Sequence, residues 1–348
     1  MVAPTLEILG GQAVQASILA ERLQSDEYSV IVLPINPQFP KGLRWLRRYP
    51  YVRTFLNEAL YFPSLLRLHC ADVVHVFSAS FWSFLLSPLP AILAGRALGK
   101  RVILNYHSGE AADHLAQWGA LVHPWLRLVD TIVVPSVYLR NIFARHGYRA
   151  LVIPNVVNTS RFRYRERSPL RPHLLSTRNL ESYYRVDNTL EAFALLKARY
   201  PEATLTIAGY GREEDRLRRL AASFGSDGIC FVGRVSPEDM PRLYGTADIF
   251  VNSSVVDNQP VSVLEAFAAG LPVVTTGTGD IINLVRDGAA GLIVPQGDPV
   301  AMAKAVTTLL ENPDGAVLMA RRARRAVEQC TWSRVRHKWA AVYSGTTA

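Results

Sequence analysis

Short runs of β-branched and other apolar residues alternate with amphipathic segments along almost the whole chain. Most of these runs are apolar at every position, which is typical of parallel strands buried on both faces of a sheet. The segments between them repeat apolar residues on one side of a helix, as at Ala192, Leu195 and Leu196. The strands predicted in this way are 30–35, 73–77, 102–106, 131–134, 151–153, 174–176, 204–208, 229–232, 249–252, 272–275 and 291–294.

Alternation of strand and helix predicts parallel sheets with right-handed crossover connections. The alternation breaks near the midpoint, at 155–172, where the chain is polar, basic and rich in proline at its end. We therefore expect an α/β protein with two Rossmann-like halves facing each other across a cleft. The predicted domains are 1–158 and 159–330, and a helix in 331–348 would return to the first domain. In such folds ligands bind beyond the carboxyl ends of the strands.

The composition agrees with this picture. The 348 residues are enough for two ordinary domains, and 49% of them are hydrophobic, which is ample for buried cores. The formal net charge of +9 favours anionic partners. The basic residues gather in three clusters, at 161–171, 41–53 and 321–325, which we interpret first as solvated surface. No zinc-finger, RRM or helix-turn-helix pattern accompanies them, so nucleic acid is not an expected partner.

Cysteine usage and hydropathy bear on the compartment. The three cysteines are far apart and odd in number, which indicates neither a disulfide framework nor a zinc site and suits a reducing cytoplasm. No signal peptide is evident at the N-terminus. The segment 77–95 carries no charge and approaches the length of a membrane span, but it contains two prolines and four serines. We interpret it as a buried connection and a helix.

The most informative stretch is 257–276, Asp-Asn-Gln-Pro-Val-Ser-Val-Leu-Glu-Ala-Phe-Ala-Ala-Gly-Leu-Pro-Val-Val-Thr-Thr. Pro260 suits the first position of a helix, and Gly270 ends that helix before the next strand. The amide groups at the helix N-terminus would form a site for phosphate. Glu265 lies about one turn into the helix and Asp257 lies at the entrance of the loop. From the pattern alone, Glu265 fits equally well as an ordinary first-turn acid that favours the helix dipole.

This stretch resembles the signature of glycosyltransferase family 4, a family of retaining enzymes with the GT-B fold that use nucleotide-sugar donors. The resemblance rests on two acids with seven residues between them, a helix of small residues and Gly-x-Pro-Val-Val, and it extends over nearly the whole chain. It implies that Glu265 binds the ribose hydroxyls and that Asp257, where the family commonly has Glu, contacts the donor sugar. The loop residues implied to face the sugar and diphosphate are Asn258, Gln259, Pro260 and Val261.

Two matches to the family lie in the first half of the chain. Gly10 and Gly11 follow a short strand and precede a helix, and the family has such a Gly-Gly loop facing the donor diphosphate. His107 follows the strand 102–106, and the matching family histidine contacts the donor sugar near the reacting carbon. Glu110 is a candidate for a base on the acceptor side.

A further match follows the strand 174–176. The family usually has an arginine there and a lysine five residues later, both of which neutralise the leaving diphosphate. Arg178 matches the arginine, but Tyr183 stands at the lysine position, and Arg185 is a displaced cation that could substitute only if the loop is longer. Gly209 and Val232 match residues that form walls of the base pocket.

The resemblance implies transfer with retention by front-face attack as the diphosphate leaves, with His107, Asp257 and Arg178 as catalytic residues. No Asp-x-Asp motif occurs, so we expect neither a metal nor any other cofactor. The predicted partners are a nucleotide-sugar donor, with UDP as the default nucleotide, and an unidentified acceptor. Alternatives are a catalytically silent protein that binds sugar nucleotides or glycans, an epimerase or a phosphorylase on the same fold, and a nucleic-acid-binding protein.

The segment 39–68 mixes basic and aromatic residues, a composition that can lie on an anionic membrane surface. The other interpretation is an acceptor-pocket wall with a solvated basic rim. Taken together, these features predict a cytoplasmic protein with possible peripheral contact at the inner face of the membrane.

Overall fold

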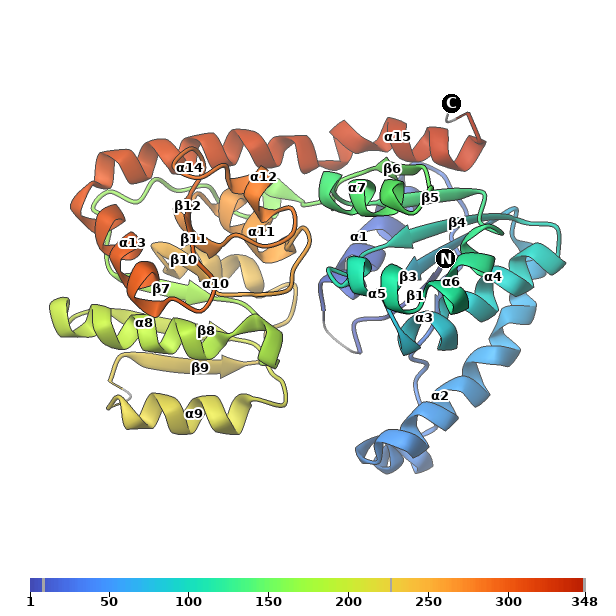
Figure 1. The fold of residues 1–348 in the computed structure, drawn as a ribbon, viewed down its shortest axis with the longest axis horizontal. Coiled ribbons are helices and arrows are strands. Elements are labelled where there is room, and N and C mark those ends of the chain that lie inside the picture. Colours follow the sequence, from blue (N-terminus) through green and yellow to red (C-terminus); the bar gives the residue numbers. More distant parts are fainter. Residues whose placement is uncertain (8–9, 226, 347–348) are drawn as a thin grey trace. The chain divides into compact units, whose positions relative to one another are not determined.

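The computed structural model describes residues 1–7, 10–225 and 227–346, with the backbone alone for Arg47 and Pro50. The chain divides into two compact units (Figure 1). Unit 1 comprises Met1–Val156 and Val335–Ala348, and unit 2 comprises Val157–Arg334. In the described part of the chain, each unit holds one six-stranded sheet in which every pair of neighbouring strands is parallel.

The sheet of unit 1 has the strand order β2-β1-β3-β4-β5-β6. Its strands are β1 Val2–Ala3, β2 Leu33–Pro34, β3 Val73–Ser78, β4 Arg101–Tyr106, β5 Thr131–Val134 and β6 Ala150–Val152. Its helices are α1 Gly11–Ser25, η1 Lys41–Arg48, α2 Pro50–Ser64, η2 Leu65–Cys70, α3 Trp82–Leu86, α4 Pro88–Ala97, α5 Ala111–Gln117, α6 Gly119–Leu126, α7 Val137–Arg145 and most of α15 Trp332–Ser344.

The sheet of unit 2 has the strand order β12-β11-β10-β7-β8-β9. Its strands are β7 His173–Ser176, β8 Thr204–Ala208, β9 Ile229–Gly233, β10 Ile249–Asn252, β11 Val273–Thr276 and β12 Leu292–Val294. Its helices are η3 Thr159–Arg161, η4 Ser182–Tyr184, α8 Val186–Arg199, α9 Glu214–Ser223, α10 Met240–Thr246, α11 Val261–Ala269, α12 Ile281–Val285, α13 Pro299–Glu311, α14 Pro313–Val327 and η5 Glu328–Cys330.

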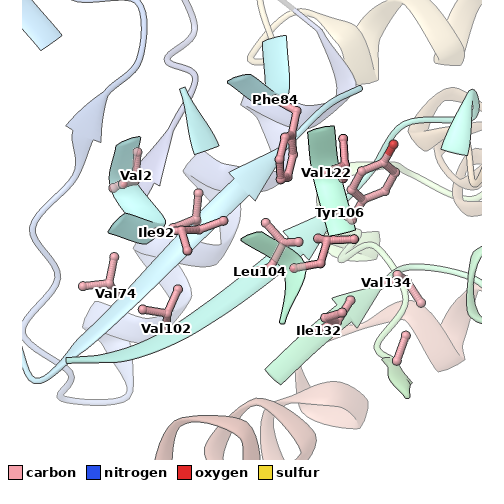
Figure 2. Close-up of a cluster of buried hydrophobic side chains, with 14 of the residues drawn as sticks. Val2, Val74, Phe84, Ile92, Val102, Leu104, Tyr106, Val122, Ile132 and Val134 are labelled. Carbon is pink, nitrogen blue, oxygen red and sulfur yellow. The ribbon is translucent and has the colours of Figure 1, made fainter. Parts of the chain in front are cut away.

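The core of unit 1 follows from the two-residue period of its strands. Val74 pairs with Val102 across β3 and β4, and alternate residues of a strand point to the same face of the sheet. Figure 2 shows Val74, Val102 and Leu104 on one side of the sheet, where they meet Ile92 of α4. The C-terminal helix α15 joins the same unit, since the Tyr343 hydroxyl lies 2.7 Å from Nδ1 of the buried His75.

Ten of the eleven predicted strands agree with the observed ones to within one residue at each end. The prediction for 30–35 is wrong in extent, because only Leu33–Pro34 pairs. This strand lies at the edge of its sheet, its neighbour β1 is equally short, and Pro34 has no N–H to donate. Among the described residues, no helix combines the length and the apolar composition that a membrane span requires. The interpretation of 77–95 is confirmed, since these residues form the end of β3, all of α3 and most of α4.

Arg167 corrects the interpretation of the 161–171 cluster as solvated surface, because its side chain is only 1% exposed. Its guanidinium donates to the carbonyl of Ala269, which ends α11, and to that of Tyr244 in α10 at 3.1 Å. The carbonyls at a helix C-terminus lack partners within the helix, and a cation there is also favoured by the helix dipole. The polar segment that follows residue 156 is therefore fastened to unit 2 rather than being a free linker.

Candidate functional site

The loop after β10 and the helix α11 form the core of the candidate site in unit 2. Pro260 adopts φ −67° and ψ 124°, an extended conformation, so it caps the helix and Val261 is the first helical residue. This places the helix start one residue later than the sequence predicted. Gly270 ends the helix with φ 77°, as predicted, and a Cβ there would lie 2.7 Å from the ring of Tyr164. The first amide groups of α11 consequently point toward the loop that carries Asp257.

Arg178, just beyond β7, reaches this loop. Its guanidinium donates to a carboxylate oxygen of Asp257 at 2.5 Å and to the hydroxyl of Ser262, in the first turn of α11, at 2.9 Å. The guanidinium also lies 4.0 Å from the ring centre of Tyr184. Arg178 is 8% exposed, and its Nε–H is buried without a partner among the described residues. A buried cation therefore lies at a helix N-terminus with one donor still unused.

Asp257 is held from both sides. Its second carboxylate oxygen accepts the backbone N–H of Asn258 at 3.0 Å, while the first accepts from Arg178. Burial raises the pKa of Asp257 above its ordinary value, and the adjacent guanidinium acts in the opposite direction. The side chains of Asn258 and Gln259 are also buried, so the loop packs against the rest of the unit and does not project into solvent.

Glu265 lies on α11 and is partly buried. Burial raises its pKa to about 7, and the nearby Tyr244 hydroxyl and the charge of Arg161 oppose that shift. The Tyr244 hydroxyl itself contacts the hydroxyl of Thr177 at 2.8 Å and donates to the carbonyl of Ser262 at 3.0 Å. At neutral pH the carboxyl of Glu265 is consequently less fully ionised than an ordinary glutamate. A partner that donates hydrogen bonds to it favours its charged form.

The loop after β11 supports the site, and sequence reasoning missed it. The backbone N–H of Asp280 donates to the carbonyl of Asn258 at 3.0 Å. Gly279 has φ +55°, and a Cβ at this position would lie 2.2 Å from the carbonyl oxygen of Asp257. The available signal was the pair of glycines, Gly277 and Gly279, just past a strand end, where glycine marks close backbone approach.

The backbone at Gly209 passes equally close to the backbone of Arg178. A Cβ on Gly209 would lie 2.0 Å from the carbonyl oxygen of Arg178, so only glycine fits there. Val232, the other residue predicted for the base pocket, lies on the edge strand β9 and is 40% exposed. The structure thus gives Gly209 a packing role next to the candidate site, and the role of both residues in base binding stays a prediction.

The sequence left Arg185 as a substitute for the family lysine, which Tyr183 replaces, only if the loop is longer. Tyr183, at the lysine position of the family pattern, is 43% exposed, and its ring centre lies 4.5 Å from that of Tyr184. Arg185 directs its Nε to a carboxylate oxygen of Asp187 at 3.0 Å. Its guanidinium is thus engaged in an ion pair at the start of α8, and Tyr184 is the side chain that packs against Arg178.

The remaining predicted residues belong to unit 1. His107 follows β4, its ring stacks on Phe77 with 5.3 Å between centroids, and its Nε2 is buried without a partner among the described residues. Burial lowers the pKa of His107 to about 4, so the ring is neutral at physiological pH. His107 lines a small pocket together with Gln15 of α1, Asn105 of β4 and Trp339 of α15.

The glycine pair lies at the start of α1. Gly10 is the N-cap of this helix and Gly11 its first residue, and no heavy atom of the described chain lies within 4 Å of a Cβ built on Gly10. The preceding strand, β1, is short, as predicted. Gln15, one turn along α1, bonds both backbone groups of Val156, at 2.9 Å and 2.7 Å, and lines the same pocket as His107.

Glu110 is exposed and joins a small polar cluster. Its carboxylate accepts from the hydroxyl of Ser80 at 3.1 Å, and Ser80 lies 2.9 Å from the hydroxyl of Ser108. These three residues come from the loops after β3 and β4, at the carboxyl edge of the sheet, where ligands bind in such folds. No group of three or more His, Cys, Asp or Glu side chains placed to hold a metal occurs among the described residues.

The chain is similar in sequence to known glycosyltransferases. The sequence matches the family models described as Glycosyltransferase Family 4, over residues 9–161, and Glycosyl transferases group 1, over residues 160–326. A glycogen synthase of Mycobacterium tuberculosis is 30% identical over 289 residues, which cover 78% of this chain and 68% of that protein. A GDP-mannose-dependent alpha-(1-6)-phosphatidylinositol monomannoside mannosyltransferase of Mycolicibacterium smegmatis is 29% identical over 294 residues, with 76% of each protein covered.

The fold has relatives among solved structures. HepE of Anabaena, in complex with UDP and glucose, superposes with a TM-score of 0.75 at 16% identity, covering 99% of this chain and 98% of that one. At this identity the match shows the arrangement of the strands and helices, namely two parallel six-stranded sheets with their helices.

Proposed function

The chain belongs to glycosyltransferase family 4 and is a glycosyltransferase with the GT-B fold, and we propose that it transfers a sugar from a UDP-sugar to an acceptor with retention of anomeric configuration. The observation that supports this most is the buried guanidinium of Arg178 at the N-terminus of α11, with one N–H donor unused among the described residues. A desolvated cation beside helix amides suits a diphosphate. In the proposed complex Glu265 accepts from the ribose hydroxyls, and Asp257 contacts the sugar.

Proteins similar to this chain use different nucleotides. HepE is a protein solved with UDP and glucose, whereas the mannosyltransferase of M. smegmatis is named for GDP-mannose. In the proposed complex, backbone groups beside Gly209 and Val232 make much of the contact with the base, as the family resemblance implies. We propose UDP as the nucleotide and leave the sugar open.

In the proposed reaction the bond between the sugar C1 and the diphosphate oxygen breaks while the acceptor oxygen bonds to C1 on the same face. The proton of the acceptor hydroxyl passes to the departing diphosphate oxygen. Arg178 and the amides of α11 stabilise the charge that develops on the diphosphate. His107, neutral because burial lowers its pKa to about 4, accepts or donates a hydrogen bond at the sugar through Nε2. Glu110, Ser80 and Ser108 are proposed to face the acceptor.

The proposed mechanism requires no metal ion and no other cofactor, because protein groups supply the positive charge at the diphosphate. The proposed partners are the nucleotide-sugar donor and the acceptor, with no nucleic acid. We also propose that the chain works in the cytoplasm, with peripheral membrane contact through 39–68.

The proposal is tested by incubating the purified chain with a panel of UDP-, GDP- and ADP-sugars in EDTA and measuring the released nucleotide. We expect UDP release from one UDP-sugar, undiminished by EDTA and lost in Arg178→Met. Water is the only acceptor in this experiment, so NMR taken before mutarotation should show that the released sugar has the anomeric configuration of the donor. Tight donor binding with no release from any donor would instead identify a silent sugar-nucleotide-binding protein, and an epimerised donor would identify an epimerase.

A further inference from the structure

Helix α2 of unit 1 carries a stripe of exposed apolar side chains. Tyr51 is 91% exposed, Phe55 72% and Phe62 48%, and Leu66 in the following η2 is 76% exposed. Tyr51, Phe55 and Phe62 are four and seven residues apart, so they lie on one side of the helix. Leu66 is four residues further on, where the same side would continue. Large apolar side chains exposed singly are ordinary, but a row of them at helical spacing marks a surface that meets an apolar partner.

The other side of the same segment is fixed to unit 1. Tyr61 is 1% exposed, and its hydroxyl donates to the carbonyl of Ser87 at 2.8 Å. Leu65 and Leu68 are buried in the core of the unit. In Figure 1 the N-terminal part of α2 extends away from the sheet of unit 1 as an arm. The stripe is therefore presented outward by a helix whose C-terminal end is anchored.

The segment η1, which precedes α2, adds exposed aromatic and basic side chains. Trp45 is 56% exposed and Tyr49 is 45% exposed. The guanidinium of Arg48 lies 5.3 Å from the ring centre of Trp45 and 4.8 Å from that of Tyr49. Such side chains suit the boundary between lipid headgroups and acyl chains. Their aromatic rings can contact the apolar acyl chains while the cation stays hydrated among the headgroups.

The charge of this segment indicates which apolar partner it meets. Residues 39–68 contain six basic side chains, at 41, 44, 47, 48, 53 and 67, and a single acid, Glu58. Burial raises the pKa of Glu58 to about 7, so even this acid is partly uncharged at neutral pH. Basic residues around an exposed apolar stripe complement the negative surface of a bilayer with anionic lipids.

We propose that η1 and α2 form a membrane-binding arm that lies in the plane of a bilayer containing anionic lipid and inserts Tyr51, Phe55 and Phe62 at the level of the headgroups. The arm deepens the membrane contact proposed above, but its binding is measured without sugar transfer. If the arm fails to bind vesicles, the proposed sugar transfer is unaffected, and if no sugar is transferred, the proposed arm is unaffected.

The test is co-sedimentation of the full chain with vesicles of phosphatidylcholine alone or with one third phosphatidylglycerol. We expect binding to the anionic vesicles that weakens at high salt, because screening reduces the contribution of exposed charges. The variant Tyr51→Ser/Phe55→Ser/Phe62→Ser should bind more weakly by at least about tenfold. The variant Arg44→Gln/Arg48→Gln/Arg53→Gln should lose the preference for phosphatidylglycerol.

A matched control is Ile282→Ser/Val300→Ser/Leu318→Ser, which removes apolar side chains of unit 2 that are 54%, 64% and 47% exposed. This control should bind vesicles as the unaltered chain does, and UDP binding should be equal in all these variants. Three results would overturn the arm: no binding to anionic vesicles, equal losses in the control, or a dimer in solution that the serine variant dissociates. Salt-sensitive binding of RNA in place of vesicles would overturn it as well.

Discussion

The guanidinium of Arg178 and the carboxylate of Asp257 form an ion pair with 2.5 Å between nitrogen and oxygen, and both side chains are about nine-tenths buried. The two residues are 79 positions apart in the sequence and follow neighbouring strands, β7 and β10. The pair holds the loop before α11 in place and leaves one N–H of Arg178 without a partner among the described residues.

Removing one member of this pair should destabilise unit 2 strongly. Asp257→Asn leaves the buried cation without its counter-charge, a change that costs about 3–5 kcal/mol in buried pairs. Urea unfolding of the variant measures this cost. The control is Glu311→Gln, whose ion pair with Arg199 is more than half exposed on both sides, and the expected loss there is about 0–1 kcal/mol. Equal losses in the two variants would contradict the account of the buried pair.

Gly279→Ala should weaken donor binding. The added methyl group would lie 2.2 Å from the Asp257 carbonyl oxygen, so the loop that carries Asp257 and Asn258 must move. Gly288→Ala is the matched control, since Gly288 has φ +74° but no heavy atom within 4 Å of a built Cβ. Both variants suffer backbone strain of about 1–2 kcal/mol in thermal unfolding. Only Gly279→Ala should lower the UDP affinity, and an unchanged affinity would show that the loop does not shape the site.

Arg167→Met should cost about 3 kcal/mol of stability, because the carbonyls at the ends of α10 and α11 lose a charged donor. Arg163→Met, at an exposed position four residues earlier, should change the free energy of unfolding by less than about 0.5 kcal/mol. Chemical denaturation of both variants checks the difference. Equal losses in the two variants, or no loss in Arg167→Met, would refute the assignment.

Glu265 predicts a specific pH dependence. Its pKa is raised to about 7 from an ordinary value of 4.5, so this carboxyl contributes stability below pH 4.5 that is lost as the pH rises through 7. Glu265→Gln should therefore raise the melting temperature at pH 8 and leave it unchanged at pH 4.5. UDP binding should run in the opposite direction and weaken below pH 7 in the unaltered chain, because the ionised carboxylate is the better acceptor. If Glu265→Gln and the unaltered chain had the same melting temperature at every pH, the raised pKa of Glu265 would be contradicted.

The sequence was sufficient for most of the fold because nearly all strands are short, β-branched and apolar on both faces, as at 131–134 and 204–208. The start and end of α11 were predicted to within one residue because Pro260 and Gly270 act locally. The pairing of Arg178 with Asp257 was not predictable, since it depends on β7 lying beside β10.

The burial of Arg167 was also not predictable from the sequence. In the sequence it is one of several alternating arginines, and only the tertiary structure shows that its guanidinium meets the carbonyls of two helix ends while Arg163 remains exposed. The site residues of unit 1, Gly10, Gly11 and His107, stay predictions in their ligand roles. Their local geometry is known, but the ligand that they would contact is a proposal.

The central claim is that α11 and its neighbours bind the nucleotide of the donor. The most direct measurement is calorimetric titration with UDP, GDP and ADP in EDTA, on the unaltered chain and on Glu265→Ala. The account predicts metal-independent binding of UDP that is lost in Glu265→Ala. Absence of binding by any of the three nucleotides, or equal affinity in Glu265→Ala, would contradict it.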